Sequence, residues 1–351
     1  MSEVSIVKCE NYELENVLCN LRKAIDNSKL PEVKDKMILI KPNILSDVPP
    51  ELCVSTHPIV VKALIIILKE MGAKKLYVGD SPAIHPPKFK AKQSQIFQIC
   101  KDEDVEWLNF HEKTTKKKVP IINRNIALVK KLDKVDFCIS VAKFKTHELM
   151  YTTGAIKNMF GLVPGLNKSK QHVYSPTRKS FAKFICGLFK ISKTEYSIMD
   201  AIMGMEGAGP GNGDPRKVGL LIASDDALAL DISQAIIMGY NPLDIPIIKC
   251  AIKKKLTKTH KISDINYTNL DANDLIIKDY KIISNKKLKE KRNVPIFLEE
   301  PCIKCKKCID ICPANALSIK NKKIIINEKK CIKCYCCHEV CPANAIKIKN
   351  N

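Results

Sequence analysis

Cysteine residues near the C-terminus carry the clearest chemistry in the sequence. Eight of them stand in two copies of the spacing C-x2-C-x2-C-x3-C, and a proline follows each copy. The first copy consists of Cys302, Cys305, Cys308 and Cys312, and the second consists of Cys331, Cys334, Cys337 and Cys341. This spacing is typical of chains that hold a pair of [4Fe–4S] clusters.

The fourth cysteine of each copy is expected to serve the other cluster, because a short helical turn separates it from the first three. The spacing therefore predicts two interlocked ligand sets. The first set is Cys302, Cys305, Cys308 and Cys341, and the second is Cys312, Cys331, Cys334 and Cys337. Zinc and a disulfide framework are the alternatives, but zinc needs only four thiolates and does not require the paired x3-C-P endings. Cys336 fits neither set and is predicted to be a buried thiol rather than a ligand.

The remaining cysteines and the N-terminus indicate the compartment. Seven cysteines precede residue 300 without any C-x-x-C spacing, which is typical of reduced thiols. The N-terminus has no signal-peptide pattern, and no stretch of eighteen apolar residues occurs to span a membrane. These features predict a cytoplasmic protein, and the oxygen lability of the expected clusters suggests an anaerobic setting.

The chain is strongly basic, with a formal net charge of +22 and a pI near 9.3. Such a charge favours either nucleic acid or an acidic protein partner. Lysine is spread along the whole chain, and no zinc finger or aromatic RNA-binding platform accompanies it, so nucleic acid is the less favoured partner. The cysteine region is itself rich in lysine, which predicts a redox partner with an acidic docking surface. These lysines are Lys304, Lys306, Lys307, Lys320, Lys322, Lys323, Lys329, Lys330 and Lys333.

Apolar runs and helical patterns alternate in the part of the chain before the cysteine region. Compact apolar runs at 37–40, 75–78, 135–141 and 218–223 predict strands, and segments at 12–25, 58–71 and 225–238 predict helices. Strands that alternate with helices favour a parallel sheet with crossover helices. The predicted fold class is α/β, with a mostly parallel sheet in Rossmann-like layers and a small α+β domain at the C-terminus. The predicted domains are 1–284 and 296–351, joined by a lysine-rich linker at 285–295.

Polar and charged residues gather where several predicted strands end. These clusters are Lys41-Pro42-Asn43, Gly79-Asp80-Ser81, Lys143-Phe144-Lys145-Thr146-His147, and Asp200 with the glycine-rich segment 204–214 after it. Ligands of open α/β sheets bind beyond the carboxyl ends of the strands. The clusters are therefore predicted to converge on one crevice.

Long motifs at these strand ends resemble a known family. They are Lys41-Pro42-Asn43, Ser55-Thr56-His57-Pro58, Gly79-Asp80-Ser81-Pro82, the segments 140–147, 154–161, 199–201, 205–207 and 209–211, and Ala229-Leu230-Asp231. Together they make the part before the linker similar to the DUF362 family, whose members are often fused to a two-cluster ferredoxin module. Because the family has no assigned reaction, the resemblance implies an architecture and leaves the activity open.

The candidate site residues are basic and acidic side chains of the predicted crevice. Lys143, Lys145 and His147 alternate, so a strand would place them on one face, close to Lys157. That face would bind a carboxylate or a phosphate, or it would be a solvated edge with extended lysines. Asp80, Asp200 and Glu206 are candidate general acids, which could instead cap helices or pair with lysines. The glycine-rich segment would either cradle an anion or form a tight connection.

Three functional hypotheses account for these features. The first is an iron–sulfur electron-transfer protein whose α/β domain binds an anionic small molecule or a redox partner. The alternative is a ferredoxin-fused oxidoreductase that reduces an anionic small molecule at the crevice of Lys143, Lys145, His147 and Lys157. The least favoured hypothesis is a basic nucleic-acid binder whose clusters are structural.

Overall fold

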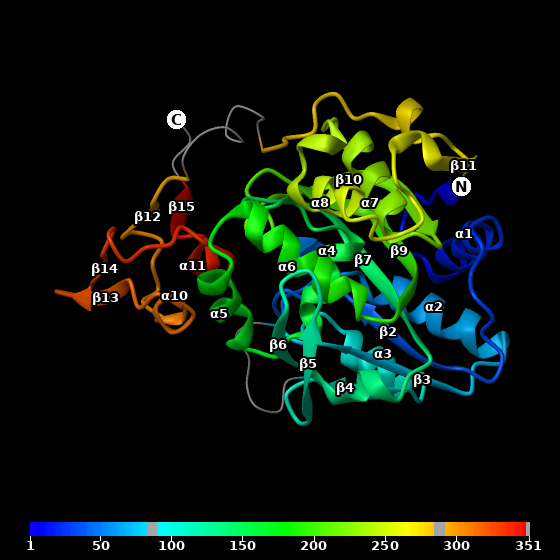
Figure 1. The fold of residues 1–351 in the computed structure, drawn as a ribbon, viewed down its shortest axis with the longest axis horizontal. Helices are drawn as coiled ribbons and strands as arrows, with labels where there is room; N and C mark the ends of the chain where they lie inside the picture. Colours follow the sequence, from blue (N-terminus) through cyan, green and yellow to red (C-terminus); the bar gives the residue numbers. More distant parts are fainter. Residues whose placement is uncertain (83–89, 284–291, 349–351) are drawn as a thin grey trace.

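The computed structural model describes residues 1–82, 90–283 and 292–348. Figure 1 shows a large α/β body, coloured from blue to yellow, with the small cysteine domain in orange and red against one side of it. The larger part of the predicted linker, 285–291, lies outside the described residues, so the domain limits stay predictions. In the described ranges, no helix combines the length and apolar character needed to cross a membrane.

A nine-stranded sheet forms the centre of the large body, in the order β11-β1-β10-β9-β7-β2-β3-β4 with β8 beside β7. Its strands are β1 (Ser2–Lys8), β2 (Met37–Pro42), β3 (Lys75–Asp80), β4 (Glu106–Asn109), β7 (Phe137–His147), β8 (Tyr151–Thr152), β9 (Thr194–Glu206), β10 (Asp214–Ser224) and β11 (Ile265–Asn269). Every pair along this order is parallel except those that β10 makes with β1 and β9. The predicted mostly parallel sheet is therefore confirmed.

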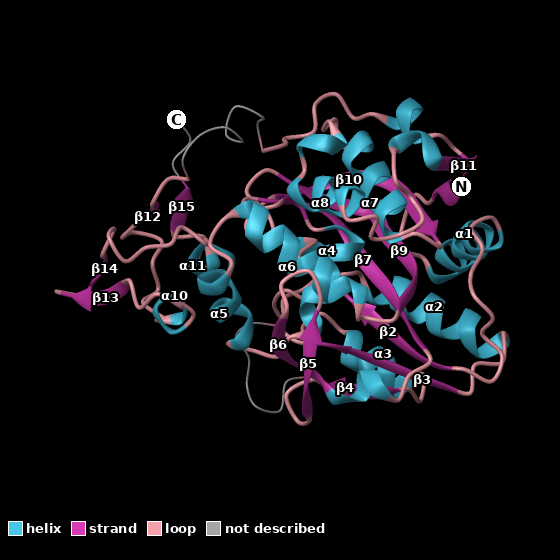
Figure 2. Cartoon of the chain, viewed as in Figure 1, coloured by secondary structure: helices cyan, strands magenta, loops and turns pink. Residues whose placement is uncertain are grey.

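Helices cover both faces of the sheet (Figure 2). They are α1 (Leu14–Asp26), α2 (Pro58–Glu70), α3 (Ile96–Asp102), α4 (Gly154–Asn158), α5 (Asn167–Tyr174), α6 (Arg178–Lys190), α7 (Ala227–Ile237) and α8 (Pro246–Lys253). The apolar residues of α1, α2 and α3 pack in one hydrophobic cluster, and those of α4, α6, α7 and α8 pack in another. Since both faces are covered, β7 is buried along all eleven of its residues, as expected of a parallel strand in an α/β protein.

Two hairpins differ from the sequence prediction. The glycine-rich segment belongs largely to a hairpin, because β9 continues to Glu206, β10 begins at Asp214, and Gly204 pairs with Arg216 inside the ladder. The second hairpin, β5 (Thr114–Val119) with β6 (Arg124–Val129), was not predicted. Its first strand carries three consecutive lysines and has only one buried residue, Val119, so it lacks the apolar signal of a core strand.

The C-terminal domain is the small α+β unit that the sequence predicts. Strand β12 (Pro295–Phe297) pairs with β15 (Ile346–Ile348), and β13 (Leu317–Lys320) pairs with β14 (Lys323–Ile326). One short helix follows the central cysteines of each copy: α10 (Lys307–Asp310) in the first and α11 (Cys336–Glu339) in the second. Figure 1 shows α11 on the side of this domain that faces the large body.

Candidate functional site

The eight spaced cysteines line two separate cavities, each of about 20 Å³. Cys302, Cys305, Cys308 and Cys341 line one cavity, and Cys312, Cys331, Cys334 and Cys337 line the other. Cys336 lines the second cavity as well. The exchange of the last cysteine between the two copies stays a prediction.

The chemistry of the thiols fits an iron–sulfur cluster. All sixteen cysteines lie in the described residues, and each is a free thiol. Within those residues, no group of three or more His, Cys, Asp and Glu side chains is arranged to hold a metal ion. The amide of Ala316 donates to Cys312 Sγ and that of Ala345 donates to Cys341 Sγ, both at 3.3 Å. Such N–H donors favour metal-bound sulfur.

The second copy is docked on the large body through α11 and the residue before it. Tyr335 is 3% exposed and packs in the hydrophobic cluster of the large body, and its hydroxyl donates to Asn293 O at 3.2 Å. The side chain of Asn212, in the turn between β9 and β10, donates to His338 O at 2.7 Å. The glycine-rich segment thus serves as a contact for the cysteine domain.

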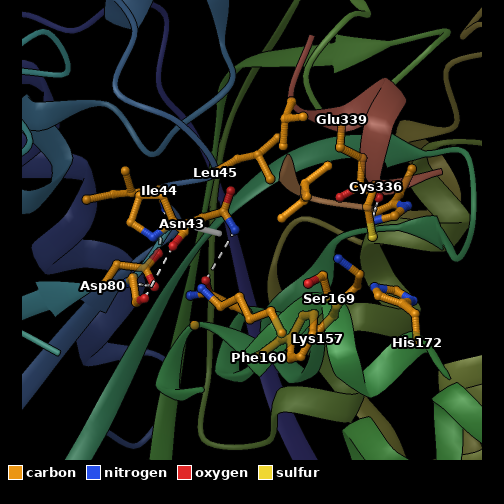
Figure 3. A pocket seen from close by; sticks show the side chains of 18 of the residues that line it. Asn43, Ile44, Leu45, Asp80, Lys157, Phe160, Ser169, His172, Cys336 and Glu339 are labelled. Carbon is orange, nitrogen blue, oxygen red and sulfur yellow. Dashed lines mark hydrogen bonds and ion pairs between the residues drawn. The ribbon is translucent and has the colours of Figure 1, made fainter. Parts of the chain in front are cut away.

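A larger cavity of about 90 Å³ lies between the two domains, at the carboxyl ends of β2, β3 and β7. Figure 3 shows Asn43 and Asp80 on one side of it, Lys157, Ser169 and His172 on another, and Cys336 and Glu339 of α11 closing it from the cysteine domain. Cys336 also lines the cavity of the second thiol set. The two cavities therefore share Cys336 in their walls.

Two lysines of this cavity have no partner in the described residues. Lys157, at the end of α4, and Lys168, which is 8% exposed in α5, form neither a hydrogen bond nor an ion pair through their ammonium groups there. Burial lowers the pKa of Lys157 to about 8, against an opposing effect of Glu339, and lowers the pKa of Lys168 to about 7, against Asp80. An anion in the cavity would relieve this cost by supplying the missing counter-charge.

The two histidines of the cavity are held neutral. Burial lowers the pKa of His172 to about 3, and the ring stacks on Phe181 at a centroid distance of 4.3 Å. Burial, with Lys157 next, lowers the pKa of His147 well below its usual value. His147 Nδ1 accepts from Leu149 N, and its Nε2 lies 3.5 Å from Glu339 Oε1 across the domain boundary. Nε2 therefore carries the proton in the neutral ring.

A buried ion pair forms one wall of the cavity. Lys41 Nζ lies 2.9 Å from Asp80 Oδ1 and donates to Asn158 Oδ1 at 3.0 Å. Asp80 Oδ2 also accepts from Ile44 N at 2.7 Å. A Cβ on Gly161 would stand 1.9 Å from Asp80 Oδ1, so only glycine lets α4 and its continuation close over this pair. Both oxygens of Asp80 therefore accept hydrogen bonds, and Oδ1 also pairs with Lys41.

The other predicted site residues lie outside the interdomain cavity. Lys143 Nζ contacts Asp200 Oδ2 at 2.8 Å and Tyr12 Oη at 3.0 Å, and Lys145 Nζ donates to the carbonyls of Val54 and Pro210. Between these two lysines the pairing of β7 with β9 shifts, because β9 advances from Asp200 to Met205 while β7 advances by two residues. Glu206 pairs with a different lysine: its Oε1 lies 3.5 Å from Lys281 Nζ. Of the predicted residues, His147, Lys157 and Asp80 meet in the cavity.

Sequence reasoning missed Lys168 and His172, as well as Glu339 of the cysteine domain. Lys168, Ser169 and His172 have the i, i+1, i+4 spacing that places side chains on adjoining parts of one helix face, and all three line the cavity. Their spacing was the available signal. No longer helical pattern marks α5, because the helix follows a proline and a glycine and is only eight residues long. No signal in the sequence indicated that Glu339 lines the cavity, since its place there depends on how the domains dock.

The fold and the thiol sites define a class of protein, namely an α/β domain joined to an iron–sulfur module of the ferredoxin type. Comparison with known families gives the particular family. The chain belongs to the family described as "Domain of unknown function (DUF362)", whose profile matches residues 38–235, more than half of its length. A "4Fe-4S dicluster domain" matches residues 301–345. The chain is therefore an iron–sulfur protein with a role in electron transfer.

Two individual proteins are similar to this chain. The "Thylakoid-associated protein sll1697" of Synechocystis is 28% identical over 287 residues, which cover 80% of this chain and 88% of that protein. A crystal structure of a protein from Thermotoga maritima superposes with a TM-score of 0.40 at 16% identity, over 63% of this chain and 57% of that one. The chain thus spans little more than half of that solved structure.

Proposed function

We propose that this protein carries two [4Fe–4S] clusters and transfers electrons, and that its large domain binds a small anion in the interdomain cavity beside the second thiol set. Cys302, Cys305, Cys308 and Cys341 would hold one cluster, and Cys312, Cys331, Cys334 and Cys337 the other. When bound, these clusters supply one-electron chemistry whose potential depends on the surroundings of the sulfurs. The cytoplasmic location and the acidic redox partner inferred from the sequence are part of the same proposal.

One observation carries the anion site: two lysines without partners in the described residues, Lys168 buried and Lys157 half-buried, line a cavity that also touches the second thiol set. Ion pairs or hydrogen bonds normally accompany a buried ammonium group. Lys41 and Lys143 have such partners in Asp80 and Asp200, whereas Lys157 and Lys168 do not. The contrast between the two pairs of lysines supports a ligand that completes the second pair.

The neighbouring residues suggest what each part of the site does. Lys157 and Lys168 would hold the anionic group, and His147 Nε2–H would orient it by donating a hydrogen bond. Asn43 Oδ1 is buried and accepts no hydrogen bond from the described residues, so it is available to a hydroxyl or amide donor of the ligand. Phe160, Ile311 and Val340 supply apolar walls that exclude water, which strengthens each of these polar contacts.

The test is calorimetric titration of the iron-loaded full chain with acetate and with inorganic phosphate, one probe for each class of anion. Lys168→Gln should weaken binding by about 1.5–3 kcal/mol, the usual loss for a hydrogen bond to a charged group, which is roughly 10- to 150-fold in Kd. Lys170→Gln is the matched control, because Lys170 lies on the same helix but is exposed. Equal binding by both variants would contradict the anion site.

The affinity for acetate should also depend on pH. Both lysines must be protonated to attract an anion, and their pKa values of about 7 and about 8 place the loss of charge in that range. Acetate stays ionised throughout, so binding should be tightest below pH 7 and should weaken as the pH rises through 8. Lys168→Gln should flatten the lower part of this profile, and a profile without any decline in the unsubstituted protein would argue against lysine as the anion ligand.

A reoxidation assay distinguishes electron transfer from simple binding. The protein is first reduced with dithionite, the excess is removed, and nitrite, a small anion that unlike acetate and phosphate can accept electrons, is added in the absence of air. Reoxidation that needs the anion, followed by the visible absorbance, would support a reductase acting on it. Binding without reoxidation would assign the anion to regulation or structure and leave electron transfer to a protein partner.

A further inference from the structure

We propose that the exposed outer face of the first cysteine copy is the docking surface for a small acidic electron-carrier protein. This outer face consists of Ile303, Lys304, Cys305, Lys306 and Lys307. The inference rests on the proposed function, since it names the partner and places it at the first thiol set. It also says where on the molecule the partner binds, which the lysine content of the sequence did not indicate.

The outer face combines an apolar centre with positive charge. Ile303 is 66% exposed, and the three lysines around it are exposed and form no ion pair with the described residues. All five residues also line the cavity of the first thiol set, and Cys305 is the exposed thiol of that set, whereas the other three are half-buried. An apolar centre with a charged rim is the composition of a transient protein interface.

Carboxylates are sparse around the outer face. The segment 303–307 contains none, and Glu299 is paired with Lys323 at 2.7 Å. Glu300 and Asp310 are exposed on either side of the segment, and together they offset two of the three positive charges. The face is therefore net positive, and a partner with a negative patch would be attracted to it over about a Debye length, roughly 10 Å at 0.1 M salt.

The second cysteine copy provides an internal reference for this inference. It has the same spacing, but the positions of Lys306 and Lys307 are taken by Tyr335 and Cys336, which are buried against the large body. The backbone is alike at this point, with φ of 62° at Lys306 and 65° at Tyr335. Cluster binding therefore does not require lysine at these positions, and the lysines of the first copy are free to serve a partner.

The two ends of the cysteine domain would then have separate tasks. A protein on the outer face would lie closest to the first thiol set, whereas the interdomain cavity touches the second set through Cys336. The partner and the anion would not compete for space. Loss of one contact should therefore leave the other intact.

The test uses oxidised flavodoxin, a small acidic flavoprotein, as the probe for binding to the iron-loaded full chain. We expect the Kd from calorimetry to rise with salt, as electrostatically guided association does. The variant K304E/K306E/K307E should bind at least about tenfold more weakly, within the range that charge complementarity gives. The control K113E/K116E/K118E makes the same change in charge on exposed lysines of the β5–β6 hairpin and should change the Kd by less than about twofold.

A second measurement separates this proposal from the anion site. The K304E/K306E/K307E variant should bind acetate and phosphate like the unsubstituted protein, and should be reduced fully by dithionite. Loss of flavodoxin binding with intact anion binding supports the outer face. Absence of flavodoxin binding at low salt, a Kd that does not respond to salt, or an equal loss in the control variant would overturn it, whatever the anion titration shows.

Discussion

The two cysteine copies share a spacing but lie in different surroundings. In the first copy, Cys305 and the lysines on either side of it are exposed to solvent. In the second copy, Cys334 is 9% exposed, and Tyr335 and Cys336 are buried against the large body. Both copies keep the same left-handed backbone between the second and third cysteines.

This difference teaches that the spacer residues determine the surroundings of each thiol set, while the cysteines determine its geometry. A lysine between the cysteines carries a hydrated charge and keeps its copy at the surface. A tyrosine at the same place offers a ring to an apolar cluster and a hydroxyl to a carbonyl. The reduction potential of a cluster depends on burial and hydrogen bonding, so two copies of one motif are expected to have different potentials.

The largest predicted effect is the loss of iron when a ligand cysteine is removed, and it should be the same in both copies. Cys308→Ala and Cys337→Ala should each lose about four of about eight iron atoms per chain, because each removes a thiolate from one cluster. Cys336→Ala should keep all of the iron, since Cys336 lies on the wall between two cavities as a ninth thiol. Iron and acid-labile sulfide analysis measures this, and loss of iron in Cys336→Ala would mean that the second ligand set is wrongly assigned.

The next effect should separate the copies. Tyr335→Ala removes a ring that is 3% exposed from the hydrophobic cluster of the large body. Truncation of a buried aromatic side chain costs about 3–5 kcal/mol, so the midpoint of thermal unfolding should fall by several degrees. Lys306→Ala is the matched control at the equivalent exposed position and should cost less than about 0.5 kcal/mol. Equal midpoints for the two variants, measured by circular dichroism, would mean that the second copy is not docked as described.

The smallest effect concerns the equivalent acidic residues of the two copies. Glu339 stands at the cavity, 3.5 Å from His147, and burial raises the pKa of its carboxyl group. Its charge should repel a bound anion, so Glu339→Gln should tighten acetate binding by about two- to fivefold, or roughly 0.4–1 kcal/mol. Asp310→Asn, at the matching position of the first copy, should leave the Kd unchanged. Weaker binding in Glu339→Gln would indicate that the carboxyl group donates a proton to the ligand instead.

Much of the fold was accessible from the sequence because its signals are local. The buried runs at 37–40 and 75–78 are apolar on both faces, and the helix that begins at Pro58 has a proline in its first turn. Parallel order then places Asn43, Asp80 and His147 at one edge of the sheet, which is where the cavity lies.

The sequence did not allow a prediction of which lysines lie at the cavity. Lys143 stands opposite Asp200 because β9 is the parallel neighbour of β7, and that pairing joins strands more than fifty residues apart in sequence. Lys145 donates to the carbonyls of Val54 and Pro210, which come from other parts of the chain. Lys157 and Lys168 differ from them only in lacking a partner, which is a property of the folded chain.

The turn between β9 and β10 contacts α11 of the cysteine domain. Gly211 lies against Glu339 O, at 3.0 Å from where a Cβ would stand, and Asn212 bonds to the neighbouring carbonyl of His338. The turn ends a ladder that pairs Glu206 with Asp214, so its height above the sheet is fixed by the strands. One extra residue in this turn would shift the position at which α11 docks by up to about 3.3 Å. The hairpin is therefore one of the contacts that determine where α11 lies against the large body.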